Sequence, residues 1–317
     1  MSFKRLDNED FVVSAESIAG VAWSSGNPNA QNFEFRATQR NEPGGKYYID
    51  AYLNETNAAN KTPIEFAVAY GNINGGGMAP FDPDVPGKSP TSVVYGQFQN
   101  LAIGDEDTKF TWGGSEQDDF YAISFTRNRY KEKILPGSWV FTLGGNSYTD
   151  ASRITPTVSF NEAGRVFPIY RVGSGGSAGS PANTNTSYGL FLPDIGVMIL
   201  DSSLVGSTST ATSNQYNPEK LIDGISNFTV NFEETISSDF VFVRARNSEY
   251  NYSENPSFIS GSTGAVAYNN FINNPQTFIT SIGLYNDMND LLAVAKLSTP
   301  LKKDFTKEAL IRVKLDF

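Results

Sequence analysis

Carboxylate side chains are the groups that could carry acid–base or metal chemistry here, since the 317 residues contain no Cys and no His. Thiolate nucleophiles, imidazole bases and the usual zinc sites are therefore excluded. The acids cluster at residues 105–107, at Asp118 and Asp119, and at Asp82 and Asp84. Hard oxygens at such spacing suit Ca²⁺, and a pair of carboxylates suits glycoside hydrolysis.

No acidic cluster has the spacing of an EF-hand loop, which needs ligands at alternate positions, a central Gly and a distal Glu. We interpret the clusters as solvated turn acids, with a bound Ca²⁺ as the alternative. A glycoside hydrolase that uses Asp105 or Asp118 ranks last. The sequence thus predicts no enzyme and no cofactor.

Two glycine-containing stretches resemble nucleotide-binding motifs only superficially. Residues 87–89 (Gly-Lys-Ser) look like the end of a phosphate-binding loop, but Asp82 stands where that loop needs its first Gly. Pro86 and Pro90 are expected to prevent the helix that would hold the phosphate. Residues 173–178 mimic a dinucleotide fingerprint, yet no βαβ pattern surrounds them, so we expect a flexible loop there.

The charge and hydropathy of the chain limit the classes of partner that it is expected to bind. A net charge of −10 repels phosphate backbones, so we expect no nucleic-acid partner. The longest apolar stretch, residues 189–200, is interrupted by Pro193 and Asp194 and is shorter than the roughly 20 residues of a membrane helix. The first residues lack the apolar core of a signal peptide, so we expect synthesis in a cytoplasm and no membrane partner.

The composition favours a mainly β fold, because the chain is 13% aromatic and rich in Gly, Asn, Ser and Thr, the residues of strands and turns. We expect a β-sandwich-like N-terminal region, a C-terminal antiparallel meander, long loops and very little helix. One short helix is predicted at residues 217–223, ended by Gly224. Strand-like runs occupy residues 46–53, 64–70, 93–98, 120–125 and 138–143.

Four parts follow from this pattern. We predict an N-terminal arm at residues 1–20, an N-terminal β domain at 21–172, a flexible linker at 173–187 and a C-terminal β domain at 188–317. The linker lacks apolar residues that could anchor it.

The C-terminal third is the most regular part of the sequence. Residues 278–285 and 291–297 flank a turn at 286–290, which predicts a hairpin, and residues 308–317 alternate as a final strand. Residues 240–246 form a predicted strand that places Arg244 and Arg246 on one face. The Pro-containing, aromatic segments 250–258 and 269–278 are predicted to be extended arms.

These patterns single out residues for contacts with other chains. We expect Arg244 and Arg246 to pair with acidic neighbours and the arms to supply aromatic and proline contacts. The arm residues are Tyr250, Tyr252, Pro256, Phe258, Phe271 and Phe278.

Residues 239–258, 274–287 and 291–317 resemble virion structural proteins of contractile-tailed cyanophages, as do residues 1–7 (MSFKRLD) and 188–196 (YGLFLPDIG). The pattern ITxIGLYND followed by LxAVAK is also similar to the baseplate-proximal part of phage tail-collar fibre proteins. The resemblance implies a non-enzymatic component of the virion tail, with the baseplate as the preferred position. Its implied partners are other virion proteins and copies of itself.

Two other positions or roles stay open. The chain is alternatively a carbohydrate-binding adhesin for a cell-surface glycan, in which Trp112, Tyr121 and Trp139 stack on sugar faces. It is also compatible with a neck or head position in the virion.

Overall fold

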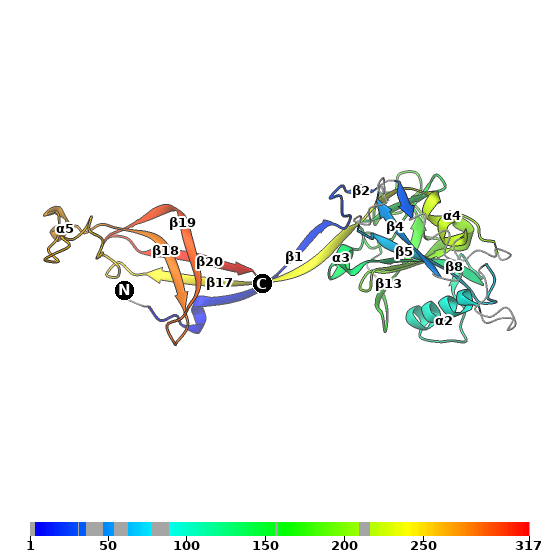
Figure 1. Cartoon of the computed structure of the whole chain (residues 1–317), viewed down its shortest axis with the longest axis horizontal. Helices are drawn as coiled ribbons and strands as arrows, with labels where there is room; N and C mark the ends of the chain where they lie inside the picture. The colour runs from blue at the N-terminus through cyan, green and yellow to red at the C-terminus, as the bar shows by residue number, and fades with distance from the viewer. Residues whose placement is uncertain are drawn as a thin grey trace. The chain divides into compact units, whose positions relative to one another are not determined.

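The computed structural model describes residues 4–30, 32–35, 47–53, 63–77, 89–155, 158–208 and 216–316. It divides into two compact units: unit 1 comprises Met1–Glu16 and Ile236–Phe317, and unit 2 comprises Ser17–Thr235. Strands make up 47% of the structure and helices 14%, which confirms the mainly β class (Figure 1).

Unit 2 is built on one large, nearly closed, barrel-like antiparallel sheet. Its strand order along the sheet is β2 (Asn29–Ala30), β16 (Ile225–Thr229), β10 (Val140–Leu143), β11 (Asn146–Thr149), β13 (Gly164–Arg171), β14 (Ser187–Leu192), β15 (Val197–Asp201), β8 (Asp119–Phe125), β5 (Phe66–Asn72), β4 (Tyr48–Leu53) and β3 (Phe33–Phe35). β12 (Ser159–Asn161) pairs with β13, β9 (Lys133–Ile134) pairs with β17 (Asn231–Ala245), and β6 (Thr111–Trp112) pairs with β7 (Ser115–Glu116). The two walls of the expected sandwich thus belong to a single curled sheet.

Both faces of this sheet carry an apolar core, as β8 shows. Tyr121, Ile123 and Phe125 join the larger core, which gathers residues from strands at both ends of the sheet. Phe120 and Ala122 join the second core, on the opposite face. Because alternate residues of a strand point to opposite faces, two cores produce the continuous apolar runs seen in the sequence.

A helix covers the second core, where the sequence predicted a strand. Residues 93–98 lie within α2 (Pro90–Ile103), so the strand prediction was wrong. The apolar residues of this segment have the spacing of a helix face: Tyr95, Phe98 and Ala102 all belong to the second core. Pro90 occupies the first turn after the capping residue Ser89, a position that tolerates proline, and therefore does not prevent the helix.

The other helices of the described residues are short. The helix predicted at 217–223 is confirmed as α4 (Tyr216–Gly224). The remaining helical elements are α3 (Arg127–Tyr130), α5 (Asn270–Asn273), η1 (Asn8–Asp10) and η2 (Ser202–Leu204).

The expected linker at 173–187 lies inside unit 2 and connects two strands that pair with each other, β13 and β14. It is also held in place: the Gly179 amide donates to Thr149 Oγ1 at 2.8 Å, and the Ala182 amide donates to the Val172 carbonyl at 2.7 Å. Backbone hydrogen bonds replace the apolar anchors that the sequence lacks. The division between units falls instead within β1 (Phe11–Val21) and β17 (Asn231–Ala245).

Unit 1 contains a three-stranded sheet in the order β1, β17 and β20 (Ala309–Asp316). β1 begins at Phe11 and so occupies the second half of the predicted N-terminal arm, and β20 is the predicted final strand. The predicted hairpin is confirmed as β18 (Thr277–Tyr285) and β19 (Leu291–Lys303), which form a separate two-stranded sheet.

Candidate assembly surface

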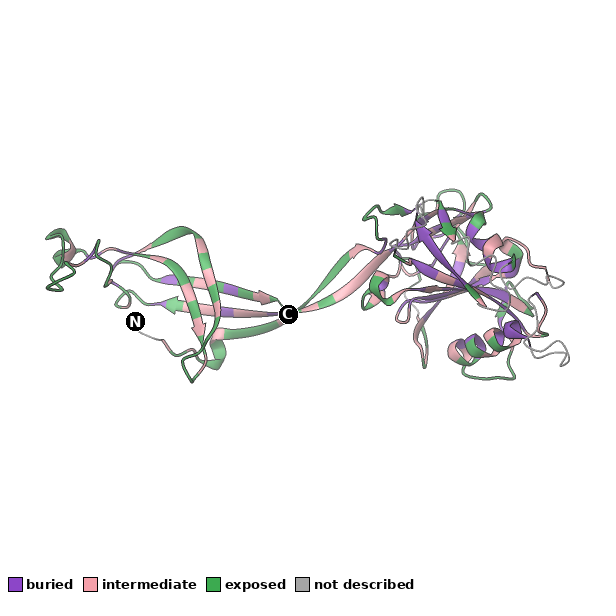
Figure 2. Ribbon diagram, in the orientation of Figure 1, coloured by how far each residue is buried: buried purple, intermediate pink, exposed green. Residues whose placement is uncertain are grey.

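Unit 1 exposes its apolar side chains instead of burying them. Both apolar core clusters of the described residues lie wholly within unit 2. Among the described residues, twenty-three large apolar side chains are exposed, and seventeen of them belong to unit 1 and six to unit 2, although unit 1 is less than a third of the chain. Figure 2 shows the contrast between mostly buried strands in unit 2 and exposed or half-buried strands in unit 1.

Four of the five buried apolar residues in the described part of unit 1 lie on one face of its three-stranded sheet. Val241 pairs with Val313, and Ala245 pairs with Ala309, and all four are buried. Apart from them, the described part of unit 1 buries one apolar side chain, Phe258. Since apolar burial is the main driving force of folding, unit 1 is poorly stabilised by its own contacts.

The opposite face of that sheet is polar and charged. Phe240 pairs with Lys314, whose Nζ lies 2.7 Å from Glu16 Oε2 and 3.1 Å from Asp316 Oδ1. The Arg312 guanidinium lies 5.2 Å from the centre of the Phe240 ring. Hydrogen bonds from Ser238 and Lys314 lower the pKa of Asp316. Ion pairs within the chain thus satisfy charged groups on this face, which also carries the exposed apolar side chain of Leu310.

The hairpin presents apolar side chains on both of its faces. Leu292 is 68% exposed and Val294 61% exposed, while Ile282 and Leu284 on the other face are half-buried. A two-stranded hairpin is marginally stable in water unless it packs against something else. The hairpin therefore leaves part of its apolar surface exposed to solvent.

Strand edges are also available in unit 1. Among the strands that the structure describes, β1 and β20 each pair with β17 alone, and β18 and β19 pair only with each other. Leu310 on β20 is 65% exposed. Unpaired edges with apolar side chains are templates for strand addition by a partner.

The segment 246–276, predicted to contain extended arms, folds back on itself instead. Phe258 is buried, stacks on Phe271 at 4.9 Å and meets the edge of Tyr252 at 5.9 Å. The amide of Phe258 donates to Asn255, and the amide of Ala267 donates to the Phe258 carbonyl. Aromatic contacts and turn hydrogen bonds thus replace the extended conformation that the prolines suggested.

The remaining predicted contact residues lie on the surface of unit 1. Tyr252, Pro256 and Phe278 are exposed, and Tyr250 adopts a left-handed backbone conformation with φ of 55°. Arg244, on β17, forms an ion pair with Glu308 of the same chain, which raises the pKa of Arg244. Arg246 lies just beyond the end of the strand and is exposed, so the two arginines do not share a strand face.

Two features of this surface escaped sequence reasoning. Val294 and Leu292 belong to the run 291–295 (LLAVA), whose lack of alternation is the signal of a strand apolar on both faces. Lys303 is completely buried, with Nζ donating to the Asn247 carbonyl and to Asn251 Oδ1, both at 3.0 Å. Nothing in the local sequence distinguishes it from its half-buried neighbour Lys302.

The aromatic residues of the adhesin alternative are core residues. Trp112, Tyr121 and Trp139 are at most 2% exposed, so they are unable to stack on a sugar. That part of the sequence interpretation was wrong, because the presence of an aromatic residue in the sequence does not show whether its side chain is buried or exposed.

The acidic residues considered above for metal binding or catalysis form hydrogen bonds and ion pairs with groups near them in the fold. Asp105 accepts hydrogen bonds from the Asp107 amide and the Thr108 hydroxyl, which lower its pKa. Asp118 pairs with Lys109 at 2.7 Å, and Asp119 accepts from the hydroxyls of Tyr70 and Ser202, both at 2.6 Å. Asp82 and Asp84 lie outside the described residues.

Within the described ranges, the structure contains neither a candidate metal site nor a candidate membrane-spanning helix. No group of three or more acidic side chains is gathered closely enough to hold a metal ion. No helix in this part of the chain has the length and apolar character needed to cross a membrane.

Neither the protein-family models, nor the curated proteins, nor the solved structures give a match to this chain.

Proposed function

We propose that the chain is a non-enzymatic structural subunit of the virion tail of a cyanophage, with the baseplate as its preferred position. We further propose that it assembles through unit 1. The observation that carries the proposal is a unit with exposed apolar strands and no apolar core cluster among its described residues. Such a unit gains much of its stability from neighbouring chains, as obligate assembly subunits do.

The charge distribution supports the same proposal. Unit 1 carries 12 acidic and 10 basic residues, whereas unit 2 carries 22 acidic and 14 basic residues. Net charge keeps proteins apart in solution, so the near balance in unit 1 removes a barrier to association. The resemblance of residues 239–258, 274–287 and 291–317 to cyanophage virion proteins supports this kind of assembly, with other tail proteins and copies of the chain as proposed partners.

Mass spectrometry on separated heads and tails of purified particles tests the proposal. We expect peptides of this chain with the tails. Enrichment with heads would move the subunit to the neck or head, and absence from both fractions would refute a structural role.

A pair of substitutions locates the assembly surface. Val294→Lys puts a charge on the exposed hairpin of unit 1, and we expect it to remove the chain from particles because a charge is costly in an apolar interface. Val93→Lys is the matched control on α2 of unit 2, at a side chain that is 56% exposed against 61% for Val294. Loss of both variants, or of neither, would contradict assembly through unit 1.

A further inference from the structure

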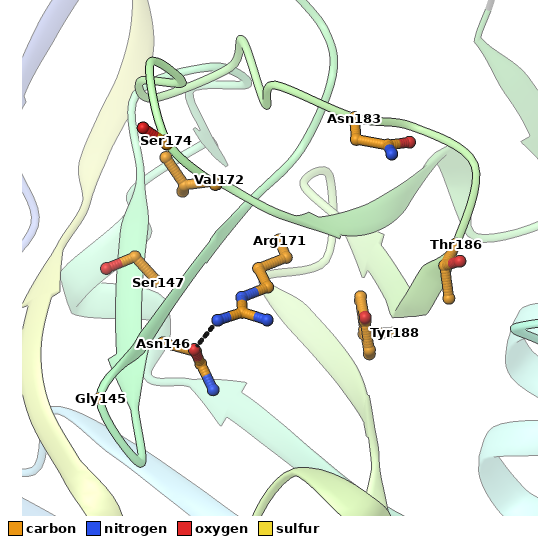
Figure 3. A pocket seen from close by; sticks show the side chains of 10 residues that line it. Gly145, Asn146, Ser147, Arg171, Val172, Ser174, Asn183, Thr186 and Tyr188 are labelled. Atoms are coloured by element: carbon orange, nitrogen blue, oxygen red, sulfur yellow. Dashed lines mark hydrogen bonds between the residues drawn. The ribbon is translucent and has the colours of Figure 1, made fainter.

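A polar pocket of about 540 Å³ lies in unit 2, beside the connection between β13 and β14. Its sides come from the β10–β11 turn and β11, from the end of β13, and from the connection itself (Figure 3). The volume falls in the range of about 300–1,000 Å³ that is usual for small-ligand sites. The pocket plays no part in the assembly proposed for unit 1.

The walls of the pocket are held in place by hydrogen bonds. The Val172 amide donates to the Ser147 carbonyl at 2.8 Å, and Tyr148 of β11 pairs with Arg171 of β13. The Asn185 amide donates to Asn183 Oδ1 at 2.7 Å on the opposite wall. A site that is ordered before binding loses less entropy when a ligand arrives.

Arg171 supplies the single charged group among the lining residues. Its side chain is exposed and points into the pocket between Asn146 and Tyr188 (Figure 3). The guanidinium donates from Nη2 to Asn146 Oδ1, and within the described residues it forms no ion pair. This cation therefore keeps donors for a ligand, in a unit that is acidic overall.

The other lining groups are neutral. Asn183, Thr186 and Ser147 offer amides and hydroxyls, and Tyr188 offers a half-exposed ring that is fixed edge-on against Tyr148 at 5.5 Å. Amides and hydroxyls both donate and accept hydrogen bonds, which matches the hydroxyls of a sugar. A ring with one open side offers a surface for the apolar face of a sugar ring.

We propose that this pocket binds a saccharide that carries a carboxylate group, with Arg171 on the carboxylate and the amides and hydroxyls on the ring hydroxyls. The planar guanidinium matches a carboxylate in a bidentate arrangement. One cation in an acidic unit suits a singly charged carboxylate better than a doubly charged phosphate. The scarcity of apolar lining side chains disfavours an apolar ligand.

Calorimetric titration of the full chain with oligogalacturonate tests the site, and the fully methyl-esterified oligomer is the matched ligand that keeps the hydroxyls and lacks the charge. We expect binding of the acid and binding at least roughly tenfold weaker of the ester. Inorganic sulfate is the third probe, and we expect it not to displace the acid.

Arg171→Gln is expected to weaken binding of the acid roughly tenfold or more, and Arg171→Lys to weaken it less, because the charge stays but the bidentate geometry is lost. Arg127→Gln changes the net charge of unit 2 equally, outside the pocket, and should bind as the wild type does. Thermal unfolding checks that each variant is folded. The proposal is overturned if acid and ester bind alike, if sulfate displaces the acid, if nothing binds, or if Arg171→Gln binds normally.

Discussion

Lys303 is a fully buried ammonium at the junction between the hairpin and segment 246–276. Its three hydrogen bonds, to Asn247, Asn251 and the Asp304 carbonyl, are all 3.0 Å long. Lysine is among the residues that are least often buried, and its burial is tolerated only when all of its donors are satisfied. One side chain thus fastens the folded segment to the end of β19.

Replacing Lys303 with Met should release segment 246–276, because two of its backbone and side-chain acceptors lose their donor. Hydrogen bonds of charged groups contribute about 1.5–3 kcal/mol, which corresponds to roughly tenfold or greater acceleration of amide exchange. Hydrogen-exchange mass spectrometry of the segment measures it. Lys302→Met is the control at a half-buried neighbour, and equal acceleration in both variants would disprove the fastening role.

Asp194 fastens the turn between β14 and β15 to β13 in unit 2. It receives hydrogen bonds from the backbone amide and the guanidinium of Arg165, at 2.8 Å from the amide and 2.5 Å from Nη2. Burial opposes ionisation of Asp194, but the bonds from Arg165 outweigh it and lower its pKa. A lowered pKa means that the folded state holds the proton less tightly than the unfolded state does.

The stability that Asp194 supplies is therefore present above its unfolded pKa of about 3.9 and is lost as pH falls through the lower folded value. We expect Asp194→Asn to destabilise unit 2 by about 1–3 kcal/mol at pH 7, with a shrinking difference from the wild type below about pH 4. Urea unfolding followed by tryptophan fluorescence reports on unit 2, because Trp23, Trp112 and Trp139 all lie in its cores. Asp223→Asn, at an exposed carboxyl, should stay within about 0.5 kcal/mol of the wild type at pH 7.

At the scale of elements, α2 contains two glycines with opposite roles. Gly96 is inside the helix, and an added Cβ would meet nothing within 4 Å. Gly104 ends the helix with φ of 77°, in the left-handed region that favours glycine. The same substitution should thus have opposite effects at the two positions.

We expect Gly96→Ala to stabilise unit 2 by about 0.5–1 kcal/mol, since alanine loses less backbone entropy in a helix. Gly104→Ala should destabilise it by about 1 kcal/mol, because the alanine Cβ strains a left-handed conformation. Urea unfolding monitored by tryptophan fluorescence measures both. Effects of the same sign would show that the helix ends elsewhere.

How far the sequence predicts these elements depends on whether neighbours in the chain determine them. Alternation predicted β5, β8 and the hairpin, because strand signals are local. At residues 93–98 local preference favoured a strand, and the distant partners Phe120 and Ile199 of the second core favoured a helix instead. Tertiary packing overrode propensity there.

The candidate surface was predicted only in part for the same reason. Exposed Tyr252 and Phe278 were singled out, but Phe258 from the same pattern is buried. The exposed apolar residue Val294 was assigned to the hairpin correctly and its exposure was not foreseen, because burial depends on what packs above a strand. The pocket around Arg171 joins residues from separate strands and has no local signal.

At the scale of the whole molecule, the two units should differ in stability when the chain is free. We expect amides of β18 and β19 to exchange at least about 100-fold faster than those of β8 and β15, which run through the apolar cores. Hydrogen exchange on the isolated chain and on purified particles measures this, with slower exchange of the hairpin expected in particles. Equal protection of both units in the free chain would contradict dependence on partners.

The chain leaves unit 1 after Glu16 and returns to it at Ile236, so the three-stranded sheet of unit 1 joins β1 to β17 and β20. Glu16 meets Lys314 across this sheet, 298 residues later. Ribosomes add about 5–20 residues per second, so β1 waits many seconds for its partners while unit 2 is made. We expect nascent chains stalled before residue 309 to contain a protease-resistant unit 2 and a sensitive N-terminus. The order of synthesis would then delay the folding of unit 1, and with it the assembly of subunits, until β20 has been made.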